Sequence, residues 1–97
     1  MKAYELMVII DPALEDEPRA AALEKVQGLV TAPGGTVDSV DEWGKRKLAF
    51  EIGGKTEGDY TVIQFHGTPE IVAEMDRVLH ITDFVVRYML LRREDLE

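Results

Sequence analysis

KAYELMVIIDP, residues 2–12, carries the strongest structural signal in the sequence. Neighbouring side chains in a strand point to opposite faces, and in this segment both faces are apolar toward Ile10. Asp11-Pro12 ends the run, which holds only about seven apolar residues, too few to span a bilayer, and no small-residue cleavage site follows. The segment therefore predicts a well-covered β-strand, with no membrane anchor and no targeting leader.

Two helices and three further strands are predicted outward from this strand. Apolar residues at helical spacing predict a first helix from about 15 to 31, and Thr68-Pro69-Glu70 starts a second helix that runs to about His80. The predicted strands are 36–52, bent or bulged at Gly44, then 60–66 after a loop at 53–59, and 84–91. The order β-α-β-β-α-β predicts an α+β, ferredoxin-like split βαβ fold: a four-stranded antiparallel sheet with both helices on one face.

Length and composition predict one folded domain. The chain has 97 residues, of which 45% are hydrophobic and 31% charged, as is usual for a protein with a packed core. We expect residues 1–97 to form a single domain with a short polar C-terminal tail from about residue 92. The absence of cysteine excludes disulfides, thiolate zinc sites and thiol nucleophiles, and fits a reducing, cytoplasmic location.

Signals for catalysis are weak throughout the sequence. His66 and His80 are isolated, and none of the common hydrolase, zinc-protease or calcium-loop motifs is present. Gly53-Gly54-Lys55-Thr56 resembles the end of a phosphate-binding loop, but it lacks the upstream glycine and no predicted helix follows it. We therefore expect no enzyme, no catalytic residue, no metal site, no cofactor and no small-molecule substrate.

Basic residues are few but clustered, in a chain whose net charge is −8. Lys45-Arg46-Lys47 follows Trp43, an arrangement used for RNA contacts, although a solvated turn has the same pattern. Alternation along a strand puts Lys45 and Lys47 on one surface and Arg46 on the other. A second basic patch of Lys2, Arg87 and Arg92 is predicted if the first and last strands are adjacent; alternatively Arg92-Arg93 pairs with Glu94 and Asp95.

The helix-free face of the sheet is predicted to be apolar. Strand alternation turns one set of side chains toward the helices: Tyr4, Leu6, Val8, Ile10, Val86, Tyr88 and Leu90. The opposite set, Met7, Ile9, Arg87, Met89 and Leu91, is then exposed. A contiguous exposed apolar surface usually marks a partner, so Met7, Ile9, Met89 and Leu91 are candidates for contact with another protein. If the alternation is reversed, Tyr4, Tyr88 and Leu90 are exposed instead.

Several motifs, in order and at the same spacing, resemble the bacterial small-subunit ribosomal protein six family over residues 2–92. They are Tyr4-Glu5 before an apolar strand, Asp11-Pro12, the WGKRKLAF segment of residues 43–50, the Gly58-Asp59-Tyr60 turn, and Leu79-x-Ile81-x-Asp83 before Val86-Arg87-Tyr88. The resemblance implies the fold predicted above. It also implies a non-catalytic protein of the cytoplasmic ribosome that supports subunit assembly and translation.

The resemblance further implies two partners, the central domain of 16S ribosomal RNA and small-subunit ribosomal protein eighteen. Carried over by position, the candidates for RNA contact are Lys2, Tyr4, Lys45, Arg46, Lys47, Arg87, Arg92 and Arg93. The open-face residues are the candidates for contact with the partner protein, and a basic partner would offset the acidic balance of this chain.

Two other functions are compatible with the predicted fold. A regulatory module that binds a metabolite would need a pocket with converging polar groups and would self-associate. An acylphosphatase-like enzyme would need a phosphate-binding loop with an arginine after the first strand, but residues 10–15 are acidic there and repel phosphate. The residues therefore favour a protein that binds RNA and a partner protein over the metabolite-binding module and over the acylphosphatase-like enzyme.

Overall fold

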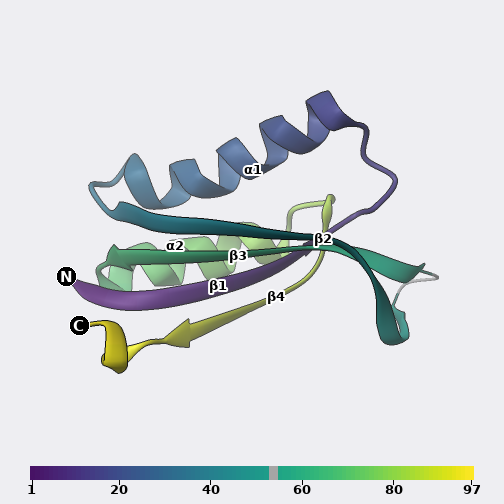
Figure 1. Cartoon of the computed structure of the whole chain (residues 1–97). Helices are drawn as coiled ribbons and strands as arrows, with labels where there is room; N and C mark the ends of the chain where they lie inside the picture. Colours follow the sequence, from purple (N-terminus) through teal and green to yellow (C-terminus); the bar gives the residue numbers. More distant parts are fainter. Residues whose placement is uncertain (53–54) are drawn as a thin grey trace.

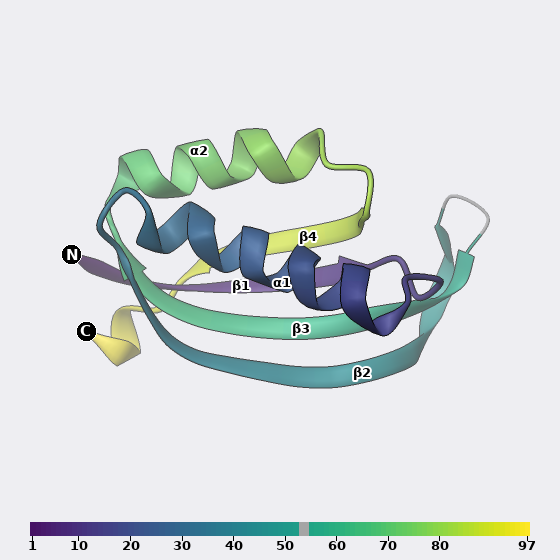
Figure 2. The same ribbon diagram turned by 90° about the horizontal axis from the view of Figure 1, so that it is seen from above.

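The computed structural model describes the backbone over residues 1–52 and 55–97, and side chains over 1–48 and 56–97. The elements are β1 (Lys2–Ile10), α1 (Asp16–Thr31), β2 (Thr36–Ile52), β3 (Lys55–Gly67), α2 (Pro69–His80), β4 (Val85–Arg92) and a short 3₁₀ helix, η1 (Glu94–Leu96). The strands pair antiparallel in the order β2-β3-β1-β4, and both helices lie on one face of the sheet (Figures 1 and 2). The predicted ferredoxin-like order is confirmed.

The core fills the space between the sheet and the two helices. Alternate residues of β1, namely Leu6, Val8 and Ile10, are completely buried, as is Phe65 from β3. They pack against apolar residues of both helices, Leu23, Val26, Val30, Ile71, Met75 and Leu79. At the start of α2 the Thr68 hydroxyl accepts a hydrogen bond from the Ile71 N–H at 3.3 Å, as the predicted N-cap requires.

The predicted alternation of β4 is confirmed at its centre and is interrupted near its start. Tyr88 and Leu90 pack against the core as expected, but at the start of the strand Val85 does so, while Val86 lines a hollow beside Leu79. The cause is a register shift, because Ile9 pairs with Arg87 whereas Ile10 pairs with Val85. Such a shift interrupts the strict alternation of faces, so Val85 packs against the core in addition to Tyr88 and Leu90.

The β2–β3 hairpin is longer than predicted. β3 begins at Lys55, so Glu57-Gly58-Asp59 lies within the strand and is neither a loop nor a turn. Its residues pair with the basic segment of β2: Lys45 with Asp59, Arg46 with Gly58 and Lys47 with Glu57. The register shifts between Glu42 and Gly44, where Gly44 has φ +81, so the predicted bulge is confirmed.

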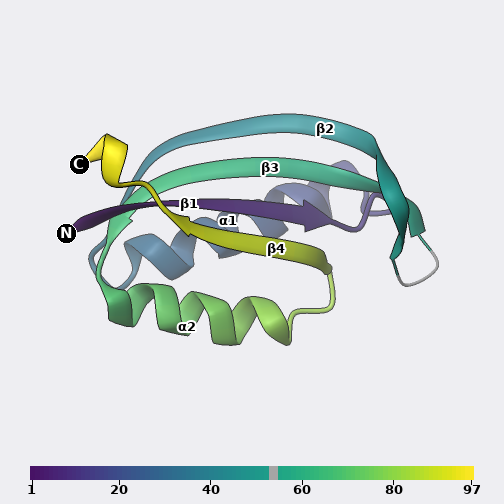
Figure 3. The same cartoon turned by 90° about the horizontal axis from the view of Figure 1, so that it is seen from below.

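Beyond this bulge the end of the hairpin bends away from the helices, toward the helix-free side of the sheet (Figures 1 and 3). Ile9 is only 4% exposed, although it lies on that face, and Leu48 of the hairpin is also buried. The hairpin backbone at Gly58 lies so close that a Cβ atom there would be 2.3 Å from Ile9 Cγ2. The prediction that Ile9 is exposed is therefore wrong.

Replacing Gly58 by alanine is expected to lower the free energy of unfolding by about 1–2 kcal/mol, because the new methyl group overlaps Ile9. Gly28→Ala is the opposite control, since its Cβ meets nothing within 4 Å and alanine favours the helix by about 0.8–1.0 kcal/mol. Urea unfolding of the two variants measures both effects. An unchanged stability for Gly58→Ala would show that the hairpin does not pack on Ile9.

Candidate nucleic-acid and protein interface

Strand pairing arranges the side chains of the helix-free face in rows that cross the sheet. In the first row Arg87 of β4 pairs with Ile9 of β1, which pairs with Tyr60 of β3, which pairs with Gly44 of β2. Trp43 stacks on Tyr60 with 6.3 Å between ring centroids, which adds it to this row. We call Arg87, Tyr60, Trp43 and Arg46 the aromatic–basic row.

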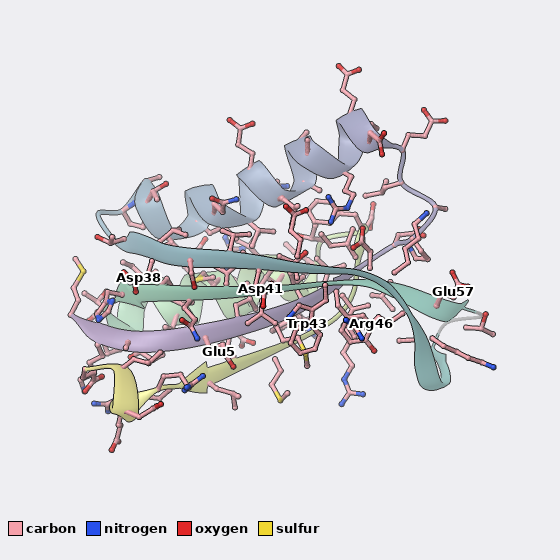
Figure 4. All side chains as sticks on the ribbon, viewed as in Figure 1. Glu5, Asp38, Asp41, Trp43, Arg46 and Glu57 are labelled. Atoms are coloured by element: carbon pink, nitrogen blue, oxygen red, sulfur yellow. The ribbon has the colours of Figure 1, made fainter. Side chains whose placement is uncertain are left out.

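Trp43 is the centre of this row and is 45% exposed. Its indole N–H donates to the Asp41 carboxylate at 2.9 Å, and the Arg46 guanidinium lies over its ring at 5.4 Å. Figure 4 shows Trp43 and Arg46 on the side of the sheet away from α1. The arrangement presents an aromatic ring and a cation on the same surface, which suits contact with a base and its phosphate.

The neighbouring rows differ in character. Met89, Met7 and Val62 form a second, apolar row, and Met89 and Leu91 are each 44% exposed. A hollow of about 230 Å³ joins this row to the first and is lined by Met7, Ile9, Tyr60, Arg87, Tyr88 and Met89. Of the four predicted protein-contact residues, Met7 is half-buried, Met89 and Leu91 are exposed, and Ile9 is covered.

The third row is polar and tightly bonded. Gln64 donates to the Glu5 carboxylate at 3.2 Å and accepts from the Ser39 hydroxyl at 3.2 Å. Arg93 reaches the same Glu5 oxygen at 2.7 Å. The apolar row therefore lies between the aromatic–basic row and a polar row in which the charges of Glu5 and Arg93 are paired.

The cluster Lys45-Arg46-Lys47 is divided between two surfaces, as predicted. Lys45 lines a hollow with Leu14 and Asp16 on the helix side, whereas Arg46 lies over Trp43 on the open face. All three side chains are exposed. A single flat ligand therefore contacts Arg46 or the two lysines, but not all three.

The predicted second basic patch is divided as well. β1 and β4 are adjacent, but Arg87 lies opposite Ile9, seven residues along β1 from Lys2, which is roughly 23 Å at the usual strand rise. Arg92 lies at the Lys2 end, opposite Tyr4. Lys2, Arg87 and Arg92 therefore do not form one surface.

The arginines of the tail are paired with carboxylates. Arg92 contacts Glu97 at 3.2 Å, and Arg93 contacts Asp95 at 2.8 Å in addition to Glu5. These bonds raise the pKa of both guanidinium groups above the usual value. The structure has the ion pairing that the sequence offered as the alternative to a free patch, with Glu97 as an added partner.

Tyr4 is a core residue. It is 8% exposed, and its ring stacks on Phe65 with 5.6 Å between centroids. The ring is thus unavailable for stacking on a base, although Lys2 at the start of β1 is exposed. The sequence placed Tyr4 both among the residues predicted to face the helices and among the candidates for RNA contact. The structure supports the helix-facing position.

Glu97 is expected to titrate below an ordinary glutamate, which has a pKa of about 4.3. The Arg92 guanidinium and, secondarily, the Ala3 backbone N–H lower the pKa of Glu97. A lowered pKa means that the tail contact is complete above the ordinary value and is lost as the pH falls through the folded value. Carboxyl NMR titration should show this, and Arg92→Gln should raise the midpoint. Arg77→Gln, far along the chain, should not; equal midpoints in all three proteins would contradict the contact.

The cations of the described side chains fall into two groups. Arg19, Arg77, Arg92 and Arg93 each form an ion pair with a carboxylate. No ion pair is present, within the described part of the chain, for Lys2, Lys25, Lys45, Arg46, Lys47 or Arg87. Carboxylates therefore neutralise the first group of cations. The second group lies on the hairpin, on β4, on α1 and at the start of β1.

Two further properties bear on the kind of site. Among the residues described, no three histidine, aspartate or glutamate side chains are grouped so as to hold a metal ion. No described helix is long and apolar enough to cross a membrane. The site is a surface of an exposed aromatic ring, apolar side chains and cations that have no carboxylate partner among the described side chains.

Fold and surface together define a ferredoxin-like α+β protein whose open sheet face carries exposed aromatic, apolar and basic side chains. The family model of ribosomal protein S6 matches residues 3–92. The chain belongs to the ribosomal protein S6 family.

Individual relatives agree with this assignment. The small ribosomal subunit protein bS6 of Clostridium novyi is 46% identical over 97% of this chain and 99% of its own length. That of Caldanaerobacter subterraneus is 41% identical over 98% of this chain and all of its own. The crystal structure of 30S ribosomal protein S6 from Thermotoga maritima has a TM-score of 0.90 at 35% identity, covering 98% of this chain and 90% of that one.

Membership of this family confirms several predictions made from the sequence. The protein is a ribosomal protein of the small subunit, and its place is the cytoplasmic ribosome. It is not an enzyme, since its relatives are named as ribosomal proteins.

Proposed function

We propose that this protein binds the central domain of 16S ribosomal RNA together with small-subunit ribosomal protein eighteen, and so supports subunit assembly and translation. The observation that carries the proposal is the set of cations without carboxylate partners in the described structure, five of which are predicted RNA contacts. They are Lys2, Lys45, Arg46, Lys47 and Arg87.

RNA contact is proposed at the hairpin end of the open face. Arg46 and Arg87 supply charge to the aromatic–basic row, and Trp43 supplies an exposed ring. Phosphate binding depends on local cations more than on net charge, because screening limits electrostatic reach to about 8 Å in physiological salt. A chain of net charge −8 can therefore bind RNA through this end.

Contact with ribosomal protein eighteen is proposed at the apolar row and at Leu91, which lies beside it on β4 and pairs with Glu5. Met7, Met89 and Leu91 offer side chains of the kind found at protein interfaces, where methionine and aromatic residues are enriched. The acidic balance of this chain favours a basic partner. No second function is favoured, since the hollow beside Met7 is shallow for a metabolite site and, among its lining residues, Arg87 is the one charged side chain.

We also infer that residues 1–97 form one domain. All four strands and both helices contribute to a common core, with the tail from about residue 92 packed against β1 through the Arg93–Glu5 pair. Cooperative unfolding in a single transition, followed by circular dichroism and by Trp43 fluorescence, is the expected behaviour. Two separated transitions would overturn this inference.

Met89→Glu is expected to weaken the complex with ribosomal protein eighteen at least tenfold, because it places a carboxylate in the apolar row at a loss of about 1.4 kcal/mol or more. Ile81→Glu is the matched control, since Ile81 is 67% exposed and follows α2. Isothermal titration calorimetry with purified ribosomal protein eighteen measures both. Equal affinities for the two variants would show that the apolar row is not the partner surface.

A further inference from the structure

Arg19 of α1 joins the helix layer to both strands of the hairpin. Its guanidinium donates from Nε and Nη2 to the Asp59 carboxylate of β3, the latter at 3.2 Å, and Nη1 contacts Glu42 of β2 at 2.7 Å. Asp59 is only 2% exposed. These carboxylates hold the pKa of Arg19 above its usual value, Asp59 more strongly than Glu42.

The two carboxylates adjoin the two stacked rings in sequence. Glu42 precedes Trp43, and Asp59 precedes Tyr60. Neighbouring residues of a strand point to opposite faces. Arg19 therefore binds Glu42 and Asp59 on the helix side of β2 and β3, and the Trp43–Tyr60 stack lies on the opposite side of the same two segments.

The Arg19 contacts also span the bulge of β2. The register shifts between Glu42 and Gly44, and Asp59 pairs across the ladder with Lys45, just beyond the shift. Arg19 thus binds one carboxylate on each side of the irregularity. A bulge bends a strand and increases its twist, so this contact fixes the direction in which the hairpin leaves the sheet.

We propose that Arg19 is a positioning residue for the binding surface, which holds the bulge and thereby sets Trp43 and Arg46 in the geometry that binds RNA. The inference rests on the proposed function, whose surface it explains. A bidentate arginine is suited to this role, because its planar fork fixes direction as well as distance.

Positioning affects affinity through the fraction of molecules that are ready to bind. The apparent dissociation constant rises in inverse proportion to that fraction. Without Arg19, the hairpin carboxylates Glu42 and Asp59 lose their ion pairs with α1, and no other ion pair joins α1 to the hairpin among the described side chains. We expect about a three- to tenfold loss of RNA affinity if the competent fraction falls to roughly 10–30%.

Removing Arg19 alone would leave Asp59 buried without its partner, which destabilises a fold. The test therefore uses the double variant Arg19→Leu/Asp59→Asn, which removes one positive and one negative charge and leaves the net charge unchanged. Arg77→Leu/Glu74→Gln is the matched control, because it removes an arginine–carboxylate pair of the same net charge from the exposed surface of α2.

Each protein is titrated with labelled central-domain 16S ribosomal RNA in the presence of ribosomal protein eighteen, at a temperature where circular dichroism shows it folded. Acrylamide quenching of Trp43, the one tryptophan, reports the state of the stack. We expect the Arg19 variant to bind three- to tenfold more weakly and to be quenched more readily, while the control matches the natural protein.

The outcomes separate this inference from the function on which it rests. Failure of the natural protein to bind would overturn the proposed function. Binding by the natural protein, with the same affinity and quenching in the Arg19 variant, would overturn the positioning role alone. A lower melting temperature with unchanged affinity and quenching would likewise show that Arg19 serves only stability.

Discussion

Phe65→Ala is expected to lower the free energy of unfolding by about 3–5 kcal/mol, the largest stability change predicted for this chain. Phe65 is completely buried at the centre of the core, and its ring stacks on Tyr4 at 5.6 Å. Its removal leaves a cavity between the sheet and the helices, because the strands on either side cannot close over it. Guanidinium unfolding followed by circular dichroism measures the change.

The matched comparison is Phe84→Ala. Phe84 lies in the link between α2 and β4, is partly buried and lies beneath Lys25 at 6.0 Å. We expect a smaller loss of unfolding free energy there, since water can fill the space that truncation of a partly exposed side chain leaves. Equal losses at Phe65 and Phe84 would contradict the placement of Phe65 at the centre of the core.

Arg46→Gln/Arg87→Gln is expected to weaken RNA binding about 30-fold at about 0.15 M salt. Each phosphate contact contributes a slope of about 0.9 in the plot of log K against log salt, so each lost contact lowers affinity roughly fivefold. The slope should fall by about two units. Fluorescence anisotropy with labelled central-domain RNA, over a range of salt concentrations, measures the affinity and the slope together.

Lys25→Gln/Arg77→Gln removes the same charge from the helix side and provides the control. A matched loss of affinity in both double variants would mean that net charge alone matters and that the open face is not the RNA surface. Loss confined to the Arg46 and Arg87 variant is the expected result.

The fold was predictable because its signals are local. Alternation in residues 2–10, helical spacing before residue 31 and the Thr68 cap each act within a few positions, and the observed elements agree with them. The start of β3 was missed because Glu57-Gly58-Asp59 has the composition of a turn. Tertiary contacts keep it in the sheet: Asp59 pairs with Arg19, and Gly58 allows the hairpin to approach Ile9.

The candidate site was only partly predictable, because exposure and pairing depend on residues distant in sequence. Strand alternation correctly separated Arg46 from Lys45, but it could not show that the hairpin covers Ile9. Tyr60 was recognised only as a strand residue, and its stacking partner Trp43 lies seventeen positions earlier along the chain, across the hairpin.

Arg19 carried no signal of its own in the sequence. It lies on an acidic helix start, and its partner Asp59 is forty residues away. Only the fold brings the two together. The role proposed for Arg19 therefore depends on three-dimensional proximity that local patterns do not encode.

The most direct test of the proposed function is a titration of labelled central-domain 16S ribosomal RNA with this protein, with and without ribosomal protein eighteen, at two salt concentrations. We expect tight binding only when the partner is present, weakened by the higher salt because phosphate contacts release counterions. Absence of binding in every arrangement would contradict the proposal that this chain and its partner bind the RNA together.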